Sequence, residues 1–172
     1  QQKRITSEVC VHHLWFDSND YERLGSKIKC NPAIKDPDHK KALFEGLLTN
    51  KLDVIATDHA PHTMLEKNNK YIKAPAGLPL VQHGLNIMLS FYFQKRITLE
   101  QLVEKMCHAP AICFNIKNRG FIKEGYQADA LILDLDAQWQ VNSDNLLYKC
   151  QWSPLEQETF QGKVQKTFVN GK

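Results

Sequence analysis

The sequence contains no apolar stretch approaching the roughly 20 residues of a membrane-spanning helix, so a membrane-spanning protein is excluded. It also lacks a strong charge of one sign, because 22 Lys and Arg face 19 Asp and Glu, for a net charge of +3. These charges are interspersed along the 172 residues, unlike the dense basic cluster of a nucleic-acid-binding protein. We therefore expect a soluble globular protein with no nucleic-acid and no membrane partner.

Cysteine pairs of the CxxC type are absent as well. The five cysteines are odd in number and widely spaced, which predicts reduced thiols in a cytoplasmic protein and not a disulfide framework. The first residues, QQKRITSEVC, contain neither an initiator Met nor an apolar signal segment. We expect this chain to be a piece of something longer.

The order of predicted elements indicates an α/β fold. Short apolar runs predict strands at 5–11 and 52–57, and a helix from Pro37 to about Asn50 lies between them. A long polar loop at 63–79 precedes an apolar helix at 80–93, and Thr98 with Gln101 forms a capping box for the next helix. From 119 the pattern changes to short antiparallel strands at 130–135, 139–141 and 163–170. We place a domain boundary near residue 118, which gives segments 1–118 and 119–172.

The segment VIATDHAPH, residues 54–62, carries the clearest chemical signal. A buried strand ends in Asp58, followed by His59 and His62. In a barrel of alternating strands and helices, residues just past the strand ends point into the catalytic mouth. An aspartate there can both bind a divalent metal and accept a proton from water. The alternative is that Asp58 caps the following helix and that both histidines are ordinary surface residues.

Three motifs, taken in order, resemble the dihydroorotase family of the cyclic amidohydrolase superfamily. They are EVCVHHL at 8–14, KCNPAIK at 29–35 and IATDHAPH at 55–62. The tail adds RGFIKEGYQADALILD at 119–134, WSPLE at 152–156 and FVNGK at 168–172. The resemblance covers essentially the whole chain. IATDHAPH is shared with allantoinases, and the complete series favours dihydroorotase.

The resemblance implies the C-terminal part of a (β/α)8 TIM-type amidohydrolase barrel, about its last two strands and their helices, followed by strands of a small β-sandwich. It implies zinc-dependent, reversible hydrolysis of L-dihydroorotate to N-carbamoyl-L-aspartate in pyrimidine biosynthesis. Asp58 matches the zinc ligand and general acid/base of the family. Asn31, His62, Ala76 and Gly77 match substrate-binding positions, and of these Ala76 and Gly77 lie in a loop of variable length.

The sequence has no His-X-His pair, which the family uses for its metal. Asp58 is the one family ligand present, so most zinc ligands are expected upstream of residue 1, in a missing N-terminal part of the barrel. We expect the isolated chain to be inactive and the complete protein to be a cytoplasmic homodimer. Adjacent residues of an extended chain point to opposite sides, and the resemblance implies that this HHL segment supplies no metal ligand. His12 and His13 are therefore assigned to structural or supporting roles. The remaining predicted structural histidines are His39, His83 and His108.

Two other functions stay open from the sequence. The first is another cyclic amidohydrolase, an allantoinase or a dihydropyrimidinase. The second is a non-catalytic, dihydroorotase-like chain that stabilises a transcarbamoylase. The presence of Asp58, Asn31 and His62 argues against the second, because a purely structural chain has no physical need for them.

Overall fold

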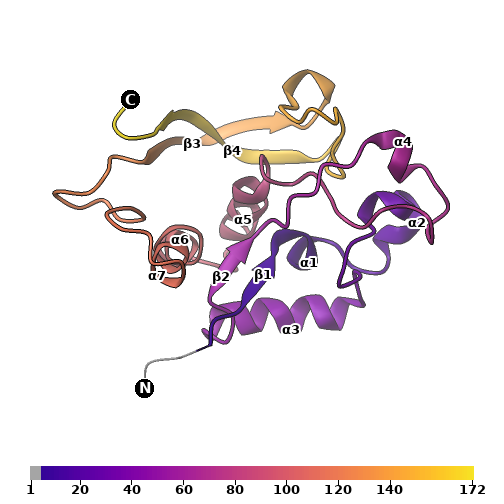
Figure 1. Cartoon of the computed structure of the whole chain (residues 1–172), viewed down its shortest axis with the longest axis horizontal. Coiled ribbons are helices and arrows are strands. Elements are labelled where there is room, and N and C mark those ends of the chain that lie inside the picture. Colours follow the sequence, from indigo (N-terminus) through magenta and orange to yellow (C-terminus); the bar gives the residue numbers. More distant parts are fainter. Residues whose placement is uncertain (1–4) are drawn as a thin grey trace.

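The computed structural model describes residues 5–172 and has an α/β architecture (Figure 1). Strands β1 and β2 pair in parallel, with Val9 opposite Ile55. The elements of this first part are β1 (Glu8–Cys10), α1 (Val11–Trp15), α2 (Asp20–Leu24), the 3-10 turn η1 (Gly25–Ile28), α3 (Pro37–Leu48) and β2 (Val54–Ala56). The two predicted strands and the helix beginning at Pro37 are confirmed, although both strands are shorter than predicted.

The chain turns into a helix directly after β1. Because α1 begins at Val11, His12 and His13 do not lie in an extended segment. Successive helical residues are rotated by about 100°, so neighbouring side chains can lie on the same side. Their ring centroids are 4.3 Å apart. The prediction that these two histidines point to opposite sides is therefore wrong.

The polar segment after β2 is not structureless. It contains α4 (Met64–Lys67), a single helical turn. The Thr63 side chain accepts from the Glu66 backbone N–H, and the Glu66 carboxylate accepts from the Thr63 backbone N–H. This capping box satisfies helix-end donors that otherwise lack partners, and it explains why the turn forms within a predicted loop.

The next helices carry the chain from the two-stranded sheet to its C-terminal part (Figure 1). They are α5 (Gly84–Phe93), α6 (Leu99–Val103), the π-helical turn η2 (Glu104–His108) and α7 (Ala109–Cys113). The capping box of Thr98 and Gln101 is confirmed. The apolar helix predicted from residue 80 begins at Gly84. No helix within residues 5–172 has both the length and the apolar character needed to cross a bilayer.

The C-terminal part is an antiparallel ribbon of β3 (Ala130–Gln140) and β4 (Thr159–Phe168), with the 3-10 turn η3 (Ser143–Asn145) between them. The strands predicted separately at 130–135 and 139–141 form one strand, because a register shift absorbs the residues between them. The ribbon packs on α5, where the Asn86 side chain donates to the carbonyl oxygen of Gly162 at 3.1 Å. Val9 and Phe160 consequently belong to one hydrophobic cluster.

Candidate active site

Asp58 lies just beyond the end of β2, where the chain leaves the sheet. Its backbone has φ 45°, in the left-handed region that residues other than glycine seldom occupy. Residues held in such conformations cluster at functional sites. The N-cap of the following helix α4 is Thr63, so the alternative in which Asp58 caps that helix is wrong.

A cavity of about 490 Å³ brings together two of the predicted site residues. Asp58 and Asn31 both line it, together with Glu8 and Cys10 of β1 and His13 of α1. Asp58 and Asn31 are both exposed, so their polar groups are accessible to a small molecule. The cavity therefore combines the carboxylate of Asp58, the amide of Asn31 and the imidazole of His13 beside strand β1.

The other predicted site residues form a second group beside the first. The imidazole Nε2 of His62 donates to the carbonyl oxygen of Ala76 at 3.0 Å. The backbone N–H of Gly77 donates to the carbonyl oxygen of Lys29 at 2.8 Å, two residues before Asn31. The structure thus joins His62, Ala76 and Gly77 to one another and ties them to the segment that carries Asn31.

Lys67 holds these segments together and was not singled out from the sequence. Its side chain is fully buried, and Nζ donates to three carbonyl oxygens, those of Lys29 at 3.1 Å, Pro75 at 3.0 Å and Gly77 at 2.9 Å. Burial lowers the pKa of Lys67 to about 8. The three acceptors match the three protons of an ammonium group, which favours the charged form at neutral pH. The capping box of α4 was the available signal, since it predicts a helical turn ending at this lysine.

The histidine next to Asp58 has a structural role. His59 Nδ1 accepts hydrogen bonds from the backbone N–H groups of Leu80 at 3.0 Å and Val81 at 3.2 Å. Burial lowers the pKa of His59, so the neutral ring that this arrangement requires is favoured. Its backbone also forms a parallel bridge with Leu78. His59 therefore fixes the chain on either side of the loop, and Asp58 remains exposed.

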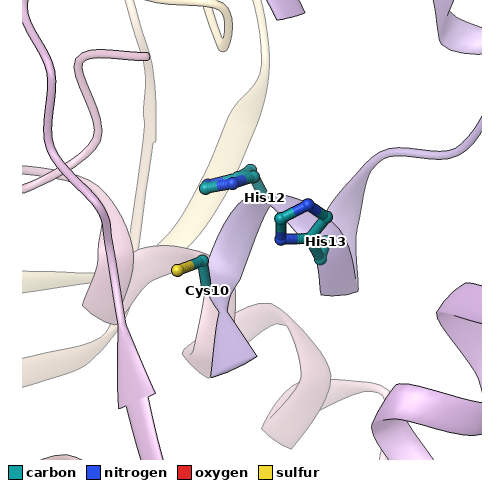
Figure 2. Close-up of side chains that lie close together, drawn as sticks. All are labelled: Cys10, His12 and His13. Carbon is teal, nitrogen blue, oxygen red and sulfur yellow. The ribbon is translucent and has the colours of Figure 1, made fainter. Parts of the chain in front are cut away.

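Within the part of the chain that the structure describes, two sets of residues have the chemistry to bind a metal. Asp58 offers carboxylate oxygens, one of the ligand types that zinc accepts. Cys10, His12 and His13 form a second set where β1 passes into α1, as Figure 2 shows. One ligand atom from each of these three side chains lies within 4.8 Å of the others. The structure removes one of the two reasons for assigning these histidines to structural or supporting roles, because they do not lie in an extended segment.

Comparison with known proteins gives a consistent result over nearly the whole chain. Residues 4–172 match the amidohydrolase family. A dihydroorotase from Methanosphaera stadtmanae is 35% identical over 99% of this chain and 39% of its own length. A dihydroorotase from Pyrococcus horikoshii is 34% identical over 98% of this chain and 38% of its own length. An L-hydantoinase (dihydropyrimidinase) from Arthrobacter aurescens superimposes with a TM-score of 0.91 at 30% identity, over 97% of this chain and 38% of that one.

The chain thus belongs to the amidohydrolase family. Within this family it is similar to the dihydroorotases named above, at about one third identity. It spans about two fifths of the length of these relatives. The predicted resemblance to the cyclic amidohydrolases is confirmed.

Proposed function

We propose that this chain supplies the C-terminal part of a dihydroorotase, which interconverts L-dihydroorotate and N-carbamoyl-L-aspartate in pyrimidine biosynthesis. The observation that carries this proposal is that Asp58, just past the carboxyl end of β2, and Asn31 line one cavity. Residues 1–118 would complete a TIM-type barrel begun by an N-terminal part, and 119–172 would belong to the β-sandwich. The similarity to dihydroorotases over nearly the whole chain supports the assignment.

Asp58 would move the proton. In the hydrolytic direction its carboxylate accepts a proton from the attacking water and returns it to the ring nitrogen as the C–N bond breaks. A carboxylate is suited to this role when it is accessible and lies next to the reacting atoms. Asp58 is exposed on the cavity, and its left-handed backbone conformation sets the direction of its Cα–Cβ bond.

The remaining site residues would hold the substrate. The amide of Asn31 can both donate and accept hydrogen bonds on the cavity wall. The Nε2–H of His62 is already committed to Ala76, so contact with a substrate carboxylate requires a proton on Nδ1 and therefore a cationic ring. The backbone groups of Ala76 and Gly77 would contact the ring of the substrate. Holding the reacting groups in place makes the attack effectively unimolecular.

The side chains of this chain could supply part of the ligands of a zinc site. Asp58 is a suitable oxygen ligand, and the other ligands would come from the N-terminal part of the barrel. Zinc, when bound, would polarise the ring carbonyl and lower the pKa of a water molecule towards neutrality. One carboxylate alone is too few ligands to retain the ion against water, so we expect catalysis only in the complete protein.

A second candidate is hydrolysis of a different cyclic amide. It is favoured by the close superposition on the Arthrobacter aurescens L-hydantoinase (dihydropyrimidinase). The two candidates differ in the charge of the substrate, because dihydroorotate carries a carboxylate and dihydrouracil does not. A cationic His62 would favour the anionic substrate.

The discriminating experiment is a comparison of substrates. In the longest native protein that contains this chain, kcat/KM should be measured for dihydroorotate, allantoin and dihydrouracil. We expect dihydroorotate to exceed the others by at least about a hundredfold, as charge-assisted contacts to one carboxylate would produce. Preference for dihydrouracil would favour the second candidate. Absence of turnover with all three would favour a non-catalytic chain.

A further inference from the structure

The turn between β1 and α1 gathers three side chains that commonly bind metals (Figure 2). One ligand atom each from Cys10, His12 and His13 lies within 4.8 Å of the others. All three come from a segment of four residues, so this chain contains the whole group.

His12 provides an independent sign of a missing partner. Its side chain is fully buried, and neither Nδ1 nor Nε2 has a hydrogen-bond partner among the described residues. The backbone of Thr57 lies near enough to favour protonation of the His12 ring, but it does not form a hydrogen bond with either ring nitrogen. Buried polar atoms nearly always have partners. Because burial lowers the pKa of His12 to about 3, the ring is neutral and one nitrogen has a lone pair to offer.

His13 is arranged as a metal-binding histidine usually is. Its Nε2 donates to the carbonyl oxygen of Pro32 at 2.8 Å. Ligating histidines almost always donate their second ring N–H to a carbonyl or carboxylate, which fixes the tautomer and the ring orientation. In this tautomer the lone pair is on Nδ1. His13 and Cys10 both line the cavity, so an ion can reach the group from solvent.

We propose that Cys10, His12 and His13 bind a zinc-like divalent cation, such as Zn²⁺ or Cd²⁺. One sulfur and two imidazole nitrogens are ligands that these ions prefer. Both imidazoles bind as neutral rings, and the thiol of Cys10 releases its proton to solvent as the sulfur bonds to the ion. Water completes the fourth position from the cavity.

Binding requires a modest local adjustment. Tetrahedral zinc has Zn–S of about 2.3 Å and Zn–N of about 2.0–2.1 Å, so its ligand atoms lie roughly 3.3–3.6 Å apart. The three atoms, which lie within 4.8 Å of one another, must therefore approach by up to roughly 1.2–1.5 Å. Cys10 and His13 are half-buried and can rotate, while His12 is held in the core. Burial raises the pKa of the Cys10 thiol to about 12, so the thiol is protonated before the ion arrives and each ion bound releases one proton.

The test is a cadmium titration of the 172-residue chain. Equilibrium dialysis would count the ions, and the ultraviolet charge-transfer band of a cadmium–thiolate bond would report the sulfur ligand. We expect one Cd²⁺ per chain and one thiolate band. Cys10→Ser should abolish the band, and both Cys10→Ser and His13→Gln should weaken binding at least tenfold. Cys113→Ser is the matched control, because Cys113 is also a half-buried free thiol but lies on α7.

Three results would overturn the proposal. One is the lack of stoichiometric Cd²⁺ binding by a folded chain. Another is a band that survives in Cys10→Ser or disappears in Cys113→Ser. The third is loss of binding in Asp58→Asn combined with full binding in Cys10→Ser, which would assign the ion to Asp58. These readouts do not involve turnover, so failure of the proposed enzymatic function would leave them unaffected.

Discussion

The ammonium group of Lys67 donates a 2.9 Å hydrogen bond to the carbonyl oxygen of Gly77. Both residues are buried, and the same ammonium group also bonds to the carbonyl oxygens of Lys29 and Pro75. One cation thus fixes the loop that carries Ala76 and Gly77 against the segment that leads to Asn31. Lys67 therefore helps to position the proposed substrate-binding groups, although it does not line the cavity.

Replacing Lys67 should loosen this region. Lys67→Met removes three hydrogen bonds and takes the partner from the buried carbonyl oxygen of Gly77, so we expect the free energy of unfolding to fall by on the order of 3 kcal/mol. Urea unfolding of this chain measures the change, and limited proteolysis should show faster cleavage within 68–77. Lys70→Met, at an exposed position of the same loop, is the control and should unfold as the unchanged chain does. Equal midpoints for the two variants would contradict the anchoring role.

Gly77 should not tolerate a side chain. Its φ is +131°, and a Cβ would lie 2.4 Å from the Cβ of Ala60 and 3.4 Å from the His62 ring. Gly77→Ala is therefore expected to destabilise the chain by about 2 kcal/mol or more, through backbone strain and steric overlap. Gly125→Ala also places alanine at positive φ, but into open space. A Gly77→Ala midpoint no lower than that of Gly125→Ala would show that the close approach is unimportant.

His62→Ala should weaken substrate binding more than it slows chemistry. Loss of a charge-assisted hydrogen bond of roughly 1.5–3 kcal/mol should raise KM for dihydroorotate about ten- to a hundredfold in the complete protein. Zinc content should stay unchanged, because His62 is not a ligand in the proposed mechanism. His108→Ala is the control, since His108 stacks on Phe121, outside the proposed site. Metal loss in His62→Ala would identify this histidine as a ligand instead.

Two buried histidines should make the fold acid-sensitive. Burial lowers the pKa of His83 to about 4 and that of His12 to about 3. The unfolded chain therefore binds protons near pH 6.5 that the folded chain does not, and stability falls as the pH drops below 6.5 towards the folded-state values. At pH 5 each ring should contribute a loss of about 2 kcal/mol.

The variant His83→Asn separates the contribution of His83 to this loss of stability from that of His12. The asparagine side chain can keep the bond that His83 Nδ1 makes with the Tyr148 hydroxyl, but it does not titrate. The decline in the free energy of urea unfolding between pH 6.5 and pH 5 should shrink by about half. An unaltered pH profile in His83→Asn would mean that this ring is protonated in the folded chain.

The sequence predicted those parts of the fold that depend on local patterns. Pro37 marks the start of α3, and Thr98 with Gln101 caps α6, because both signals act within a few residues. The motif order placed Asn31 and Asp58 in one site, and the structure puts both on one cavity. The sequence did not predict that β3 continues through residues 136–138, because a bulge is not visible in hydrophobic alternation.

The supporting residues of the site could not be predicted in the same way. A lysine in a polar segment is normally exposed, and burial of Lys67 depends on carbonyl groups from Lys29, Pro75 and Gly77 that only the folded chain assembles. The side chains of His12 and His13 come together because the backbone changes from strand to helix at Val11. The spacing of apolar residues does not reveal this change from strand to helix, because α1 has only five residues.

The most direct test of the proposed function is the turnover of Asp58→Asn in the complete protein. The amide keeps an oxygen for the metal but cannot accept and return a proton, so kcat for dihydroorotate should fall by about 10²–10⁴-fold with zinc content and circular dichroism unchanged. Asp136→Asn, an exposed aspartate on β3, should retain full activity. A kcat for Asp58→Asn within a few-fold of the unchanged protein would contradict the assignment of Asp58 as the general acid/base.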